Sequence, residues 1–106
     1  MTRSTITVPA DMVELLDDAS LSLQDFARCA RLAPEWVQTH VQAGVLQPAS
    51  GGGATEWRFA STTVVRARRI AELEHIYDAD PQLAGLTADL MEEVAALRRA
   101  MQRLAD

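Results

Sequence analysis

Lysine is absent from this chain, and cysteine occurs only once, as Cys29. A single cysteine can form neither an internal disulfide nor a thiolate metal site by itself, so we expect Cys29 to be a small buried side chain. No run approaches the ~20 apolar residues that span a bilayer, and the first residues lack the apolar core of a signal peptide. These absences predict a cytoplasmic protein without a membrane span.

The residue patterns that mark common catalytic and metal sites are also missing. There is no nucleophile elbow, no phosphate-binding loop, and no histidine or cysteine cluster at metal-ligand spacing. The two histidines, His40 and His75, fall on different predicted helices, where we expect surface or half-buried positions. We predict that the protein is not an enzyme and that it binds no cofactor and no metal.

Acidic residues outnumber basic ones by 15 to 10, which gives a formal net charge of -5. An acidic chain is repelled by the phosphates of nucleic acids. The 106 residues are enough for one domain, and the 48% hydrophobic content is typical of a chain that folds. We therefore expect one compact unit plus an appendage, working by binding another protein.

The first twenty residues contain two candidate elements. The alternation of Thr, Ile, Thr and Val at residues 5–8 predicts a short strand that ends at Pro9. Asp11 and Glu14 have the spacing of a capping pair, so residues 11–20 are interpreted as a helical turn or a second extended piece.

Two short helices follow, joined by a turn of roughly three residues. Ser22 and Asp25 resemble a capping box at the start of the first helix, which extends to about Leu32. Pro34 suits the first position of the second helix, and Gly44 suits its left-handed C-terminal cap. Together the two helices predict a helix-turn-helix arrangement.

The stretch after the second helix predicts a β-hairpin, or wing. A polar, glycine-rich loop at residues 50–55 precedes Trp57 and Phe59, which alternate with charged residues and should face the helices. Because two strands alone are marginally stable, we expect this hairpin to pair with the strand at residues 5–8.

The last part of the chain predicts two further helical segments. One should run from a cap at Ser61 to about Tyr77, and the segment from Pro81 carries a leucine at every seventh residue. Heptad spacing favours a partner helix, so we predict a homodimer; the alternative is a helix packed on its own domain. This divides the chain into a helix-turn-helix domain over residues 1–80 and a dimerisation helix over residues 81–106. The predicted dimer interface consists of Leu83, Leu90, Val94, Leu97, Met101 and Leu104.

The order of these parts resembles the N-terminal domain of MerR-family regulators. The resemblance rests on LQDFA at residues 23–27, VQAGVLQP at residues 41–48 and WRF at residues 57–59. It implies a mainly α fold: a MerR-like winged helix-turn-helix with a small β-hairpin or sheet and a C-terminal dimerising helix. Those regulators typically carry an arginine and a tyrosine just before the Ala-Gly-Val-Leu stretch, where this chain has Gln38 and His40.

The short length, the acidic second helix and the tail at residues 86–98 are still more similar to the CbpM family of chaperone modulators. Members of that family bind the J-domain of the DnaJ-like co-chaperone CbpA and restrain its activity. The resemblance implies the same role here, in which the chain covers the J-domain face that recruits Hsp70. An acidic surface suits this role, because J-domains recruit Hsp70 through a basic helix and a His-Pro-Asp loop.

The candidate partner-binding residues lie on or beside the helix-turn-helix and the third helix. They are acids, together with two glutamines as neutral hydrogen-bonding positions: Asp25, Glu35, Gln38, Gln42, Glu72, Asp78 and Asp80.

The main alternative is a compact MerR-like regulator that binds DNA as a dimer. Arg58 on the wing and the arginine group at residues 66–69 would then contact phosphates. DNA readers normally carry arginine or lysine near the start of the recognition helix. The second helix here, residues 34–43, has neither and carries Glu35 at that place. DNA is therefore the less favoured partner.

Overall fold

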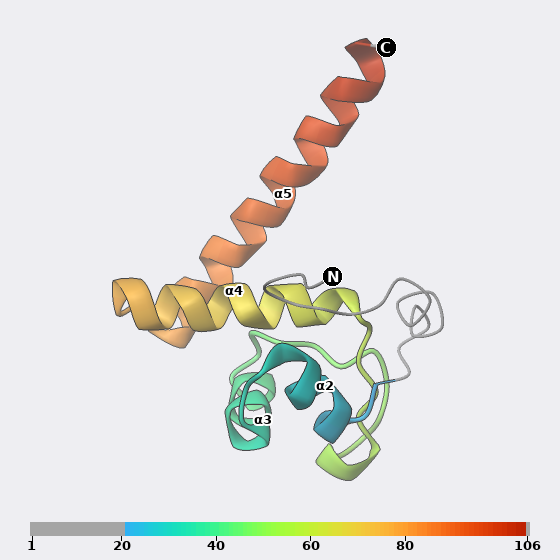
Figure 1. The fold of residues 1–106 in the computed structure, drawn as a ribbon, viewed down its shortest axis with the longest axis vertical. Coiled ribbons are helices and arrows are strands. Elements are labelled where there is room, and N and C mark those ends of the chain that lie inside the picture. The colour runs from blue at the N-terminus through green and yellow to red at the C-terminus, as the bar shows by residue number, and fades with distance from the viewer. Residues whose placement is uncertain (1–20, 106) are drawn as a thin grey trace, which may run out of the picture.

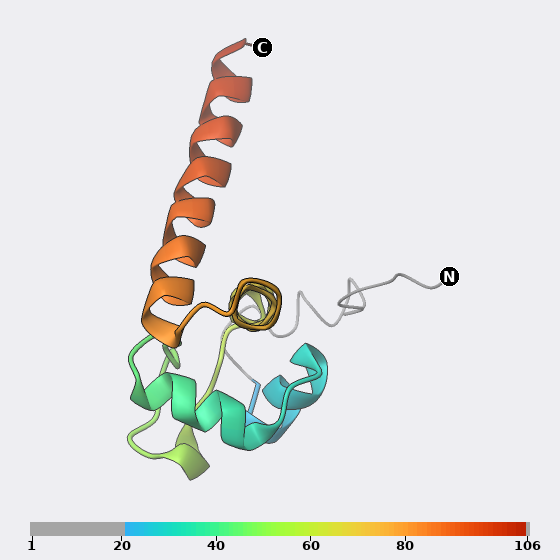
Figure 2. The same cartoon turned by 90° about the vertical axis from the view of Figure 1, so that its left-hand side faces the viewer.

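The structure, a computed structural model, describes residues 21–105, and four α-helices account for most of that range (Figure 1). The mainly α class is therefore confirmed. Three helices, α2 to α4, form a body with their connecting segments (residues 21–77), and α5 runs out of it (Figures 1 and 2). The strand predicted at residues 5–8 and the segment predicted at residues 11–20 lie outside the described residues.

The first two helices, α2 (Leu23–Ala30) and α3 (Pro34–Gln42), follow the signals in the sequence. Ser22 is the N-cap of α2, and its hydroxyl accepts a hydrogen bond from the backbone N–H of Asp25 at 3.2 Å. Gly44 follows α3 with a φ of 83°, a left-handed conformation that glycine adopts without strain. The short connection between the two helices is confirmed.

The predicted wing is reduced to two contacts. Within residues 21–105 the strand-like pairings are isolated antiparallel bridges, one between Leu21 and Phe59 and one between Ser50 and Arg58. The short 3-10 helix η1 (Ala54–Glu56) occupies part of the loop, so few extended residues remain for a ladder. Leu21 exchanges two backbone hydrogen bonds with Phe59, at 2.8 and 3.2 Å.

The core is centred on a stacked pair of rings. Phe26 of α2 lies on Phe59 with a centroid distance of 4.4 Å, and Trp57 meets Phe59 edge-on at 6.1 Å. The rings of the wing segment therefore face the helices, as predicted. The helices and the loop after α3 complete this core with Val37, Leu46, Val64, Ala67 and Ile70.

The two remaining helices are long. α4 (Thr62–Tyr77) crosses the body, and α5 (Pro81–Ala105) is one continuous helix of 25 residues (Figure 1). Ser61 precedes α4, but its side chain makes no cap hydrogen bond, so the predicted cap is wrong; its backbone is already helical, with φ -62° and ψ -30°. None of the helices in the described range is long and apolar enough to cross a membrane.

The first turns of α5 are packed into the body. Ala84, Gly85 and Ala88 are buried. A Cβ on Gly85 would lie 2.8 Å from Cγ1 of Val45, so this close approach requires a residue without a side chain. Part of α5 therefore belongs to the core.

One arginine of α4 fixes α5 at this contact. The Arg66 Nε donates to the Val45 carbonyl at 3.0 Å, and its Nη1 lies 2.8 Å from the Asp89 carboxylate and 3.1 Å from the Glu92 carboxylate. Beyond Glu92, α5 extends away from the body (Figure 2). We call residues 93–105 the outer half of α5.

Candidate functional site

The ends of α3 and α4 and the start of α5 meet at one corner of the molecule. The side-chain amide of Gln82 donates to the Ala43 carbonyl at 2.9 Å, which ties the start of α5 to the end of α3. Residues 78–80 connect α4 to α5 at the same place. Three predicted partner-binding residues thus come together. We use the term acidic corner for these three and the last two residues of α4: Gln42, Ile76, Tyr77, Asp78 and Asp80.

The backbone fixes both carboxylates of the acidic corner. Asp78 ends α4 in a left-handed conformation, with a φ of 57°. The Asp80 Oδ1 accepts a hydrogen bond from the backbone N–H of Leu83 at 2.8 Å and so caps the start of α5. Both residues are exposed. Two negative charges therefore stand two residues apart on a rigid connection.

The apolar part of the acidic corner was missed by sequence reasoning. Ile76 and Tyr77 are 62% and 72% exposed. An exposed aromatic side chain beside charged groups is typical of protein-binding sites, where tyrosine often supplies much of the binding energy. A sequence signal existed for Ile76, because its spacing of six residues from the buried Ile70 places it on another face of the helix.

The other four predicted contacts lie elsewhere. Glu35 and Gln38 are on α3, exposed and half-buried respectively, and Glu72 is exposed on α4. Asp25 belongs to the first turn of α2, which lies far from the end of α4 (Figure 1). Its carboxylate pairs with Arg28 at 3.2 Å. The structure therefore does not bring Asp25 to the acidic corner.

Some acids of the described chain are neutralised and others are not. Asp89 and Glu92 are held by Arg66, and Asp25 by Arg28. Within residues 21–105, no cationic side chain lies at salt-bridge distance from Glu35, Glu72, Asp78 or Asp80. Acids on α3, α4 and the acidic corner therefore keep their charge available to a partner, as do the exposed Glu56 and Glu93.

A buried polar cluster joins α3 to α4. His40 is only 5% exposed, and Trp36 stacks on its ring with a centroid distance of 3.6 Å. The His40 Nε2 lies 2.6 Å from Oε2 of Glu74, and the Trp36 indole N–H donates to Oε1 of Glu74 at 3.2 Å. His40 is therefore buried, and the expected surface or half-buried position is wrong, because its side chain and that of Glu74 pair across the helix contact.

The hydrogen bonds of this cluster define what it can do. The His40 Nδ1 lies 2.7 Å from the Trp36 carbonyl, which can only accept, so Nδ1 carries a proton. Because both nitrogens of the ring and both oxygens of the carboxylate are engaged, the cluster holds α3 against α4. In the described part of the chain, no group of three or more His, Cys, Asp or Glu residues could hold a metal ion.

The arginine group of α4 is largely engaged inside the molecule. Arg66 binds the Val45 carbonyl and two carboxylates of α5. Arg68 donates to the Ala30 carbonyl at the end of α2, at 3.1 Å. Arg69 makes no such contact within residues 21–105, and it lines an open groove between α4 and α5. Two of the three arginines that a DNA-binding surface would use are therefore committed to internal contacts.

The predicted dimer residues share one property on α5. All six are exposed, from 46% for Val94 to 86% for Leu104. We call this set the α5 stripe: Leu83, Leu90, Val94, Leu97, Met101 and Leu104.

The chain matches no protein-family profile, no curated protein and no solved structure. The geometry of the acidic corner and of the α5 stripe is therefore the basis for assigning a role to each surface.

Proposed function

We propose that the protein is a chaperone modulator, which binds the J-domain of a CbpA-like, DnaJ-type co-chaperone and prevents that J-domain from stimulating Hsp70. The family resemblance supplies the partner. The observation that supports it is the acidic corner, where the exposed carboxylates of Asp78 and Asp80 stand beside the exposed ring of Tyr77.

Binding would proceed by charge complementarity followed by apolar contact. The carboxylates attract the basic helix of the J-domain, which raises the association rate and orients the encounter. Tyr77 and Ile76 then supply apolar area that is lost to water on docking. While this face of the J-domain is covered, it cannot contact Hsp70. Inhibition is therefore competitive, and it requires no catalysis by this chain.

The body is proposed to be a reduced form of the MerR-like winged helix-turn-helix. The three-residue connection between α2 and α3 and the two bridges of the wing support this assignment. In DNA-binding members the second helix carries the base-reading side chains. Here that helix, α3, turns Trp36 and His40 toward α4 and leaves Glu35 exposed. These features favour a protein partner over DNA.

The proposal includes a homodimer formed through the α5 stripe. Its six side chains expose apolar surface on one helix at heptad spacing, which a second helix would bury. The dimerisation function is assigned to residues 81–106, although the first turns of this segment also contribute to the body.

Calorimetric titration of the full chain with the isolated J-domain of a CbpA-like co-chaperone tests the proposed partner. We expect binding with a Kd of micromolar or below that weakens as salt is added, since complementary charges are screened. A duplex DNA titration at the same salt should show no heat of binding. If the J-domain titration shows no heat of binding and the chain instead binds duplex DNA in a salt-sensitive way, the proposal is overturned in favour of a transcriptional regulator.

A matched set of isosteric variants locates the binding surface. Asparagine tolerates the left-handed conformation of residue 78 and still caps a helix at residue 80, so Asp78→Asn and Asp80→Asn remove charge and keep the fold. We expect the double variant to bind the J-domain about tenfold more weakly, mainly through slower association. Asp25→Asn, on the far side of the body, is the control and should bind unchanged. An equal loss in both would show that the acidic corner is not the contact.

A further inference from the structure

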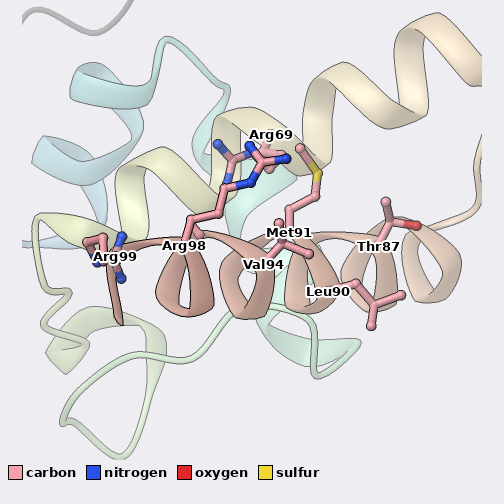
Figure 3. A pocket seen from close by; sticks show the side chains of 8 residues that line it. Arg69, Thr87, Leu90, Met91, Val94, Arg98 and Arg99 are labelled. Carbon is pink, nitrogen blue, oxygen red and sulfur yellow. The ribbon is translucent and has the colours of Figure 1, made fainter. Parts of the chain in front are cut away.

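Arginines and apolar side chains line a groove where α4 and α5 diverge. Its walls include Met91, Ala95 and Arg98 of α5 and Arg69 of α4. A second hollow continues it toward the start of α4, and both hollows are lined by Arg69, Ala95 and Arg99. The side chains of Arg69 and Arg98 point to the same side of α5 as Met91 (Figure 3). The groove therefore presents positive charge beside an apolar surface.

The charges of this groove are not neutralised by the described part of the chain. Arg69, Arg98 and Arg99 have no ion-pair partner within residues 21–105. Glu92 is the one acid that lines either hollow, and it is held by Arg66 at 3.1 Å. Three unpaired arginines thus stand together in a chain whose formal net charge is -5. A complementary occupant is acidic on one side and apolar on another.

Residues 11–19, with the sequence DMVELLDDA, have this composition and lie outside the described residues. They contain no basic residue and four acids, namely Asp11, Glu14, Asp17 and Asp18. At a helical spacing of about 100° per residue, Met12, Leu15 and Leu16 fall on one side and the acids on the other. The segment therefore matches the groove both in charge and in apolar surface.

This segment is attached to the body beside the groove. Leu21 is held by two backbone hydrogen bonds to Phe59, which lies three residues before Thr62 at the start of α4. Thr62 lines the near end of the groove, and Arg69 lies about 10 Å further along α4. An extended chain covers about 3.3 Å per residue, so residues 16–21 can span roughly 17 Å. So short a tether gives the segment a millimolar effective concentration at the groove.

We infer that residues 11–19 bind in this groove of their own chain, with their apolar side on Met91 and their acids toward the three arginines. The contact goes beyond the proposed J-domain binding and is independent of it, because the acidic corner lies at the other end of α4. Of the six residues of the α5 stripe, only Leu90 and Val94 line the groove, so the proposed dimer surface stays largely open. The segment thereby covers a positive surface that would otherwise attract other acidic molecules.

Disulfide trapping in the full chain tests this contact. Cys29→Ser removes the single native thiol, and cysteines are then introduced in pairs. Leu16→Cys with Met91→Cys joins the apolar side of the segment to the groove. Leu16→Cys with Glu93→Cys is the matched control, because Glu93 is exposed about 200° further around α5. With oxidised glutathione we expect the first pair to link within one chain about tenfold faster than the control pair, as measured by mass spectrometry.

Charge variants test the proposed ion pairs in the same trapping chain. Arg98→Glu together with Arg99→Glu should slow the linkage about tenfold, and added salt should slow it in the unchanged chain. Adding Glu14→Arg and Asp18→Arg to the first two changes should restore the rate. Arg103→Glu, on α5 but outside the groove, is the control and should leave the rate unchanged. No effect of any charge change would contradict the assignment of the arginines.

Two outcomes of the trapping would overturn the inference. One is equal linkage at residues 91 and 93, with the segment cysteine placed at either residue 12 or residue 16, since the segment then does not dock in the groove. The other is linkage between chains only, which would assign the groove to the segment of a second copy. Neither outcome bears on J-domain binding, which the calorimetric titration measures separately.

Discussion

Leu46 in the body is 1% exposed, whereas Leu104 at the end of α5 is 86% exposed. The arginines differ in the same way. Arg66 and Arg68 each bind a carbonyl of the body, and Arg66 also binds two carboxylates of α5. Arg98, on the outer half of α5, has no ion-pair partner among residues 21–105. Every buried side-chain polar atom in the described range has a hydrogen-bond partner. The body thus buries most of its large apolar side chains and pairs its buried polar atoms, whereas the outer half of α5 leaves its apolar side chains exposed.

The two regions are joined by a short contact that both depend on. Gly85 allows α5 to approach Val45, and Arg66 holds Asp89 and Glu92. Because α5 is packed and ion-paired at this contact, the core sets the direction in which the outer half leaves the body. The surfaces proposed for self-association and for partner binding are therefore held on one frame, with the acidic corner at one end and most of the α5 stripe beyond it.

The largest difference between the body and the outer half of α5 is expected when Leu46 and Leu104 are each truncated to alanine. Leu46→Ala should destabilise the body by about 2–5 kcal/mol, because it leaves a cavity in a packed core. Leu104→Ala should leave the free energy of unfolding unchanged at a concentration where the chain is monomeric, since that side chain is in water. Urea unfolding at low concentration measures both, and sedimentation detects the loss of dimer in Leu104→Ala. A large stability loss in dilute Leu104→Ala would contradict the division into two regions.

Replacing Glu74 in the body and Glu93 on the outer half of α5 compares how much a polar side chain contributes to stability in each region. Glu74→Ala should cost about 1–3 kcal/mol of stability, because Nε2 of the buried His40 and the Trp36 indole N–H lose their hydrogen-bond partner. Glu93→Ala, on the outer half of α5, is the matched control and should not alter unfolding of the monomer. Thermal and urea unfolding of the dilute proteins give the two values. Equal, small effects would mean that the cluster between α3 and α4 is solvated.

Local signals predicted the helices well because each acts over a few residues. Ser22 starts α2 and Gly44 follows α3, in both cases through a backbone requirement that is visible in the sequence. The cap at Ser61 failed because its backbone continues the helical conformation. The wing was overestimated, since alternation at Trp57 and Phe59 indicates which side chains face the core but not how many residues pair.

Contacts between distant residues could not be predicted in this way. His40 and Glu74 are 34 residues apart, and nothing in either local pattern indicates that α3 and α4 place them within 2.6 Å. The acidic corner depends equally on tertiary packing, because Gln82 at the start of α5 donates a hydrogen bond to the carbonyl of Ala43 at the end of α3. Sequence reasoning therefore identified individual acids such as Asp78, and the structure shows which of them share a surface.

The smallest effect is expected at the junction of the two regions. Gly85→Ala adds a Cβ that would lie 2.8 Å from Cγ1 of Val45, so α5 must shift or Val45 must change rotamer. Overpacking of this kind costs about 1–3 kcal/mol, while replacing glycine inside a helix returns about 1 kcal/mol, so a net loss of about 0–2 kcal/mol is expected. Adding Val45→Ala removes the clashing methyl groups, and it should make the glycine substitution neutral or stabilising against that background. If Gly85→Ala instead stabilises the otherwise unchanged protein, α5 is not held against the body at this point, and the outer half is free to orient independently of the acidic corner.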